Sequence, residues 1–144
     1  MTERRAQDIL ARSFRWFDNR IFTNVWFAGG EMDLAVVTKA GMLWEIEIKT
    51  TKSDWAADSK KRKWGHPDRH KISRFYYAVP RTLVMWPPWQ MPDYAGIIAI
   101  GQSSAWVHRK ARVRRGYKVT QQELDNFMRS TYYRYWRERL RVRD

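Results

Sequence analysis

The sequence predicts an α/β protein with a mixed β-sheet flanked by helices. The order of its elements is the reason, because patterns typical of a helix, three strands, a helix, further strands and a last helix follow one another. The 144 residues contain no repeat and no Gly/Ser-rich linker, and 44% of them are hydrophobic, which suits one domain with its own core. We expect residues 1–116 to form this core and residues 117–144 an additional basic, aromatic helix on the same domain.

The first predicted elements are a helix and a strand. Apolar residues recur at intervals of three and four over residues 3–18, and Thr2 is placed to cap this helix. Aromatic and β-branched residues at 21–27 predict a strand, and Gly29-Gly30 suits the two-residue turn of a hairpin.

Two further strands are predicted at residues 31–37 and 42–49, where side chains alternate with period two. If Lys39-Ala40-Gly41 is a three-residue loop with Gly41 in the left-handed conformation, Thr38 faces Met42 and the register of the hairpin is fixed.

The second half of the chain is predicted to contain both helices and strands. Ser53 can cap a short helix that ends in the basic run at residues 60–63, and residues 71–79 suggest another helix, ended by Pro80. Short apolar runs predict strands at residues 83–86, 96–100 and 105–108.

The last helix has the clearest start, because residues 120–123 form a capping box, Thr120-Gln121-Gln122-Glu123. Four arginines fall mostly on one side of it: Arg129, Arg134, Arg137 and Arg141. A broad apolar stripe on the other side predicts packing onto the sheet or a second subunit. Its members are Leu124, Phe127, Met128, Tyr132, Tyr135, Trp136 and Leu140.

The protein is strongly basic, with 28 Lys and Arg against 15 Asp and Glu and a formal net charge of +13. This charge indicates a polyanionic partner, nucleic acid first and anionic lipid second. The chain shows no membrane helix and no signal peptide, so we expect a cytoplasmic protein of a bacterial or phage-infected cell that does not bind membranes. It has no cysteine, which excludes disulfides and thiolate metal sites.

Acidic residues concentrate on one face of the second predicted hairpin. In the expected register Asp33 lies opposite Glu47 and Glu31 lies opposite Lys49, with Glu45 on the same face. Opposed carboxylates repel unless a cation lies between them, and oxygen ligands without thiolates favour Mg²⁺ or Mn²⁺. The alternative is a solvated polar face on which Glu31 and Lys49 form an ordinary ion pair.

These residues resemble the signature of the PD-(D/E)xK nuclease superfamily, which has the restriction-endonuclease-like fold. Met32 replaces the leading Pro of the motif, and the resemblance covers roughly residues 1–110. Within the superfamily the sequence is most similar to the MmcB-like DNA-repair branch. The segments that carry this similarity are Glu47-Ile48-Lys49, Ser53-Asp54-Trp55, Asp58, Lys63-Trp64, residues 74–80 and Asp93-Tyr94-Ala95-Gly96-Ile97-Ile98.

The resemblance implies a metal-dependent deoxyribonuclease of DNA repair, recombination or phage DNA processing. Asp33, Glu47 and the carbonyl of Ile48 would bind Mg²⁺ or Mn²⁺, and Lys49 would position water and offset phosphate charge. The first helix of the superfamily often adds a carboxylate, for which Glu3 is preferred over Asp8. Glu31 is a competing candidate.

Two basic stretches are predicted to hold a phosphate backbone. The first is residues 60–63, with Trp55 and Trp64 nearby, and the second is residues 109–115, part of which also suits an exposed edge strand. The predicted contacts are Lys52, Lys60, Lys61, Arg62, Lys63, Arg109, Lys110, Arg112, Arg114 and Arg115. Aromatic residues in such numbers can stack on bases, but we assign most to the core, namely Trp16, Trp26, Trp44 and Trp136.

Other functions remain open at this point. A non-catalytic nucleic-acid-binding protein could keep the fold and the basic surface, an enzyme could act on RNA, and the aromatic last helix could mediate a homodimer. A zinc site at His66 and His70 is disfavoured, because Pro67 breaks a helix there.

Overall fold

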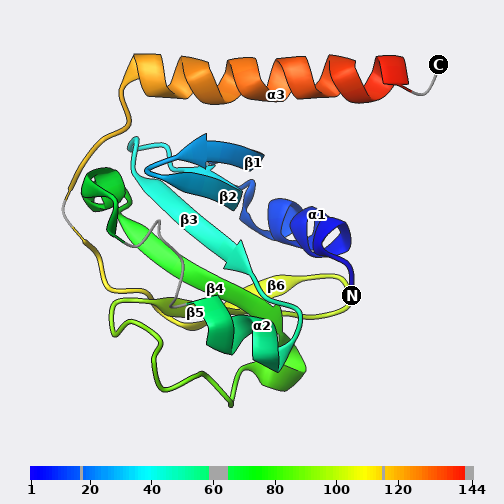
Figure 1. The fold of residues 1–144 in the computed structure, drawn as a ribbon, viewed down its shortest axis with the longest axis vertical. Helices are drawn as coiled ribbons and strands as arrows, with labels where there is room; N and C mark the ends of the chain where they lie inside the picture. Colours follow the sequence, from blue (N-terminus) through cyan, green and yellow to red (C-terminus); the bar gives the residue numbers. More distant parts are fainter. Residues whose placement is uncertain (17, 59–64, 115, 142–144) are drawn as a thin grey trace.

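A computed structural model describes residues 1–16, 18–58, 65–114 and 116–141. The elements follow one another as a helix, a three-stranded meander, a helix, three more strands and a long last helix (Figure 1). They are α1 (Glu3–Phe14), β1 (Arg20–Phe27), β2 (Gly30–Val37), β3 (Leu43–Ile48), α2 (Lys52–Ala57), η3 (Pro67–Lys71), β4 (Arg74–Pro80), η4 (Arg81–Leu83), β5 (Gly96–Ile100), β6 (Ala105–Arg109) and α3 (Gln121–Arg141).

The six strands form one mixed sheet in the order β1-β2-β3-β4-β5-β6. The β1–β2, β2–β3 and β5–β6 pairs are antiparallel, whereas β3, β4 and β5 are parallel neighbours. The parallel β3–β4 pair requires a crossover connection, and α2 lies within it. The predicted α/β class with a mixed sheet is therefore confirmed.

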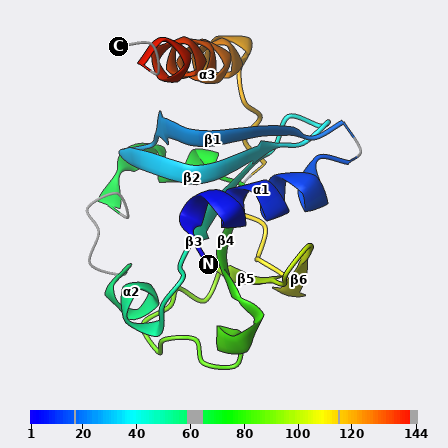
Figure 2. The same cartoon turned by 90° about the vertical axis from the view of Figure 1, so that its right-hand side faces the viewer.

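Helices cover both faces of the sheet, and Figure 2 shows α3 and α1 on opposite sides of β1 and β2. Helix α1 buries Ala6, Ile9 and Leu10 against the face that carries Leu34 and Ile46. The opposite face is covered in two parts, by Leu124 and Phe127 of α3 over β1 and β2, and by Trp55 and neighbouring loops over β4 and β5. Both faces of the central strands are therefore buried.

Helix α1 begins and the second hairpin turns as the sequence predicts. Thr2 caps α1 by accepting a hydrogen bond from the Arg5 backbone N–H, although the helix ends at Phe14 rather than at 18. Gly41 is left-handed at φ +86°, and Thr38 N–H donates to the Met42 carbonyl at 2.9 Å. This confirms the predicted hairpin register, which the structure extends to the Leu34–Ile46 pair.

Two local predictions are displaced by one or two residues. The first hairpin turns at Ala28-Gly29, both with positive φ, and Gly30 already belongs to β2. Helix α2 is capped by Thr51 rather than Ser53, since the Thr51 hydroxyl accepts from the Asp54 N–H.

The helix predicted at residues 71–79 is wrong, because Arg74–Pro80 is the central parallel strand β4. Such a strand is covered on both faces, so its sequence is a continuous apolar run without period-two alternation, which periodicity cannot separate from a buried helix. The strand predicted at 83–86 is also wrong, since η4 and a turn occupy this region. The strands predicted at 96–100 and 105–108 are present as β5 and β6, and Arg112–Arg114 is not an edge strand.

The predicted stripe of α3 is mostly exposed. The capping box forms as expected, with Thr120 N–H donating to Glu123 and Glu123 N–H donating to Thr120 Oγ1, but only the start of the stripe, Leu124 and Phe127, is buried. The assignment of Trp16, Trp26 and Trp136 to the core is likewise wrong, because all three are exposed, whereas Trp44 is half-buried and packs against the core.

The structure also bears on membranes. None of the helices in the described ranges combines the length and the hydropathy that a membrane crossing needs.

Candidate functional site

The candidate site begins where β2 and β3 separate. Their pairing stops at Leu34–Ile46, so the next hydrogen-bonded pair of the same register, Met32 with Ile48, does not form. Instead the Ile48 N–H donates to Asp33 Oδ2 at 2.8 Å. The side chain of Asp33 thus replaces a main-chain acceptor and is held beside the segment that carries Glu47 and Lys49.

A buried glutamine of α1 braces the backbone at Asp33. Gln7 Nε2 donates to the Asp33 carbonyl and to Asn24 Oδ1, both at 2.9 Å. Asn24 has a φ of +51°, a conformation that Asn tolerates better than most residues. Helix α1 therefore holds the Asp33 backbone directly and contacts β1 through the Asn24 side chain.

Lys49 lies between two buried carboxylates. Its Nζ is 2.9 Å from Asp58 Oδ1 and 3.5 Å from Glu47 Oε1, and all three side chains are less than a tenth exposed. The backbone N–H of Lys49 donates to the Ala78 carbonyl of β4, which continues the parallel pairing at the end of β3. We call Asp33, Glu47, Lys49 and Asp58 the acidic cluster. The alternative of a solvated polar face is wrong, because Glu47 and Lys49 are covered.

Asp58 and Tyr77 are residues of this site that sequence reasoning did not select as functional. The Tyr77 hydroxyl donates to Asp58 Oδ2 at 2.7 Å, and burial, followed by this hydrogen bond and the charge of Asp58, raises the pKa of Tyr77. Trp55 packs against the Tyr77 ring at 5.9 Å between centroids. Both residues lie in segments that carry the family resemblance, which was the one signal that could have found them. Tyr77 was not selected because its segment was predicted to be a helix.

A pocket of about 290 Å³ opens beside the acidic cluster. Glu3, at the start of α1, lines it together with Lys49 and Asp58. The structure therefore brings the predicted additional acid of the first helix to the wall that also carries Lys49. Remaining lining residues are Ile48, Thr50, Asp54 and Ala57.

Two other acids of the hairpin lie outside this arrangement. Glu31 is exposed, and although both residues are described, no ion pair joins it to Lys49 as the extrapolated register suggested. Glu45 is fully buried and forms its own ion pair with Arg69 at 2.6 Å. The four acids predicted to share one patch are thus divided between different environments.

The acidic cluster suits a hard divalent cation in the chemistry of its donors. Asp33 and Glu47 supply carboxylate oxygens and Ile48 a carbonyl, and Mg²⁺ in proteins is commonly held by one or two carboxylates with several retained waters. Within the described ranges no group of three or more His, Asp or Glu side chains is arranged to hold a metal ion. Asp33, Glu47 and Ile48 thus offer oxygen donors of the type that such a cation prefers.

The predicted nucleic-acid contacts include a residue of α2 and the stretch at and after the end of β6. Lys52 is exposed and lies over the Trp86 ring at 5.6 Å, while Lys60, Lys61, Arg62, Lys63 and Arg115 lie outside the described residues.

The basic stretch after β6 is only partly available for phosphate contacts. Arg109 donates to the Ala95 carbonyl, Arg112 pairs with Asp93 at 3.4 Å, and Arg114 is half-buried over the Tyr94 ring. Lys110 is exposed.

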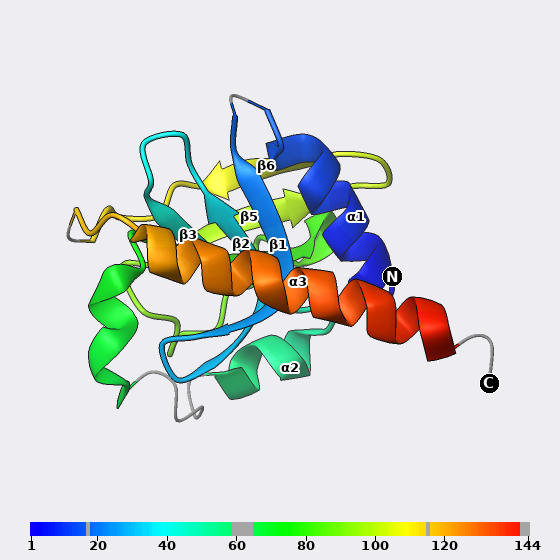
Figure 3. The ribbon, with the colours of Figure 1, turned by 90° about the horizontal axis from the view of Figure 1, so that it is seen from above.

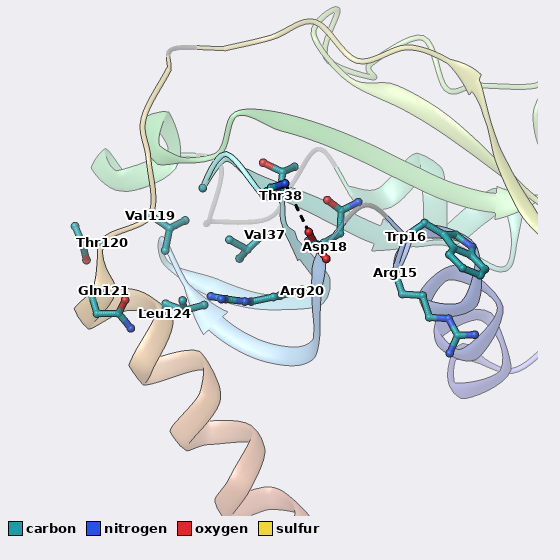
Figure 4. Close-up of a pocket in the computed structure, with 13 residues that line it drawn as sticks. Arg15, Trp16, Asp18, Arg20, Val37, Thr38, Val119, Thr120, Gln121 and Leu124 are labelled. Carbon is teal, nitrogen blue, oxygen red and sulfur yellow. Dashed lines mark ion pairs between the residues drawn. The ribbon is translucent and has the colours of Figure 1, made fainter.

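A larger hollow of about 800 Å³ lies away from the acidic cluster, between the end of α1, the start of β1 and the start of α3 (Figure 4). Arg15, Trp16, Arg20 and Leu124 are among its lining residues, and Lys39 and Asp18 form an exposed ion pair there at 3.8 Å. No residue of the acidic cluster lines this hollow, so the larger cavity is not the candidate site.

Comparison with known proteins bears on the fold. No protein-family model and no curated protein matches the sequence. A protein of unknown function from Silicibacter pomeroyi has a similar structure, with a TM-score of 0.68, 20% sequence identity, and coverage of 100% of this chain and 92% of that one. At this identity the likeness concerns the fold alone.

Proposed function

We propose that this protein is a divalent-metal-dependent DNA nuclease of the PD-(D/E)xK type. The observation that carries the proposal is the hydrogen bond from Ile48 N–H to Asp33, which holds the Asp33 carboxylate beside the strand that bears Glu47 and Lys49. Asp33 is thereby held next to the segment that contains Glu47 and Lys49, the residues that the sequence resemblance also groups with it.

Charge supports a cation at this place. Asp33, Glu47 and Asp58 supply three carboxylates to the acidic cluster, while the whole chain carries a formal net charge of +13. Carboxylate oxygens attract a cation, and the basic chain as a whole attracts a polyanion. Both partners of metal-dependent phosphodiester hydrolysis are thus favoured.

The element order also supports the proposal. Helix α1, the β1–β2–β3 meander, α2 and the parallel strand β4 follow one another, with Asp33 on β2, Glu47 on β3 and Lys49 directly after β3. This arrangement is compatible with a restriction-endonuclease-like core, to which α3 is added.

The roles of the residues follow from their positions. Asp33 and Glu47 would bind Mg²⁺ or Mn²⁺ with the Ile48 carbonyl, and the bound cation would acidify water and polarise the phosphodiester. Lys49 would orient the water and stabilise charge that develops on the phosphate. Asp58 and Tyr77 hold the Lys49 ammonium in place, and Glu3 is positioned to receive a further ligand at the pocket wall.

A nuclease assay tests the proposal. Purified protein is incubated with single-stranded, duplex and branched DNA, and with an RNA strand, in Mg²⁺, Mn²⁺ or EDTA. We expect DNA cleavage that needs the metal and is lost in Asp33→Asn and Lys49→Met. Asp33→Asn keeps an oxygen that can accept from Ile48, so its loss of activity reports the charge rather than the fold.

Matched controls are Asp8→Ala and Lys39→Ala, which remove an exposed acid and an exposed lysine away from the acidic cluster. Both are expected to cleave like the wild type. Cleavage that persists in EDTA or in Asp33→Asn contradicts the proposal. Retarded migration of DNA without any cutting under all metal conditions indicates the non-catalytic binding protein instead.

A further inference from the structure

The distal half of α3 presents a row of uncovered side chains. Met128, Tyr132, Trp136 and Leu140 follow the buried Leu124 at intervals of four residues. Because an α-helix has 3.6 residues per turn, each step of four turns the side chain about 40° further round the axis. The row therefore winds away from the sheet, and Tyr132 is 60% and Trp136 40% exposed.

The helix is nevertheless firmly attached at its middle. Phe127 contacts the rings of Phe22 and Phe27, each at 5.5 Å between centroids. Arg134 donates to the carbonyls of Thr23 and Asn24 and to the Thr23 hydroxyl. The exposed row is thus displayed by a helix that is anchored to β1.

The same stretch of α3 is strongly basic. Arg129, Arg137, Arg139 and Arg141 are exposed, and Glu138 is the single acidic residue among positions 126–141. A second copy of this surface would bring like charges together, which disfavours self-association. Arginines interleaved with exposed aromatic rings instead match a flexible polyanion with unpaired bases, because phosphates bind guanidinium groups and bases stack on rings.

The distal half of α3 also extends toward the side of the molecule where α1 begins. In Figures 1 and 3 the C-terminal turns of α3 extend past the strands on the side where the N-terminus of α1 lies. Glu3 of α1 lines the pocket beside the acidic cluster. A strand held on α3 would therefore leave it on the side of the molecule that carries the candidate site.

We propose that the exposed face of α3, formed by Met128, Arg129, Tyr132, Tyr133, Trp136, Arg137, Arg139, Leu140 and Arg141, binds single-stranded DNA. Stacking on Tyr132 and Trp136 supplies preference for unpaired bases, and the arginines supply affinity without reading sequence. The inference gives α3 a ligand beyond the proposed cleavage and does not depend on it.

Binding is measured by fluorescence anisotropy with a labelled single strand and the matching duplex, in EDTA so that cleavage plays no part. We expect tighter binding of the single strand, and about tenfold or more loss of its affinity in the double variant Tyr132→Ala/Trp136→Ala. The control Tyr132→Phe/Trp136→Phe keeps the rings and is expected to retain binding. The triple variant Arg137→Gln/Arg139→Gln/Arg141→Gln is expected to lower the salt slope of log affinity by about 2.

Unchanged affinity in the alanine variant, or equal affinity for the duplex, overturns the inference. So does a wild-type dimer in light scattering that the alanine variant converts to a monomer, because the row would then cover a second copy. The two proposals fail separately: a protein that binds as described but never cuts loses the nuclease assignment alone, and one that cuts while the α3 variants bind normally loses this inference alone.

Discussion

Lys49 and Asp58 form a buried ion pair, with 2.9 Å between Nζ and Oδ1, across the connection that contains α2. The pair joins the end of β3 to the residue that follows α2, and the Tyr77 hydroxyl ties the same carboxylate to β4. The group that would act on phosphate is thereby held by the crossover itself.

Asp58→Ala is expected to destabilise the protein by about 3 kcal/mol, because it leaves the buried Lys49 ammonium with Glu47 alone. Tyr77→Phe is expected to cost about 2 kcal/mol through loss of a hydrogen bond to a charged group. Urea denaturation measures both losses of stability. Because Tyr77 donates its hydrogen bond to Asp58 itself, the double variant should lose less stability than the sum of the two single variants. Additive losses would show that the contact contributes nothing.

Divalent cations are expected to stabilise the wild type by binding the native state. Thermal denaturation with and without Mn²⁺ should show a rise in Tm that EDTA reverses and that Asp33→Asn and Glu47→Gln remove. Asp8→Ala, an exposed acid on α1, should keep the full rise. Equal rises in the wild type and in Asp33→Asn would place any bound cation elsewhere.

The start of α3 is expected to make stability depend on pH. Burial raises the pKa of Glu123, but hydrogen bonds from the Thr120 backbone and the Tyr117 hydroxyl and the charge of Lys71 outweigh it, so the pKa of Glu123 is lowered. A lowered carboxyl pKa adds stability above the ordinary value of 4.5, which is lost as pH falls through the folded value.

Glu123→Gln should therefore lower the free energy of unfolding at neutral pH and approach the wild type in acid. Urea denaturation over a pH series measures the difference between the two proteins. A difference that stays constant from neutral pH to well below 4.5 would contradict the assignment.

Burial along α3 predicts a sharp contrast between two aromatic residues five positions apart. Phe127→Ala empties a packed site against Phe22 and Phe27 and should cost about 3–5 kcal/mol. Tyr132→Ala removes an exposed ring and should change stability by less than about 0.5 kcal/mol. A large loss in Tyr132→Ala, measured at a concentration where the wild type is monomeric, would mean that the ring is covered.

The sequence was sufficient for the antiparallel half of the fold because its signals are local. A period of two, a left-handed Gly41 and the capping residue Thr2 each act within a few residues, and the structure agrees with them. The register that these signals set is also what led to Asp33, Glu47 and Lys49 as neighbours. Whether these residues catalyse a reaction stays a prediction.

The parallel half could not be predicted in the same way. Strand β4 is buried on both faces by elements far away in sequence, so no alternation marks it as a strand. The position of Tyr77 beside Asp58 could therefore not be predicted either. Similarly, the period of α3 shows that one side is apolar but not where the sheet ends, which decides that Phe127 is covered and Trp136 is not. In both places the missing information is tertiary.

The crossover between β3 and β4 affects the order in which the parts of the candidate site fold. Asp33, Glu47 and Lys49 belong to the local β2–β3 hairpin and the residue after it, and closing such short loops costs little conformational entropy. Asp58 and Tyr77 join them only after the chain has returned to pair β4 beside β3. A nascent chain that has emerged only as far as β3 holds these three groups without the partners that fix the lysine. The proposed site is therefore completed late, together with the closure of the sheet.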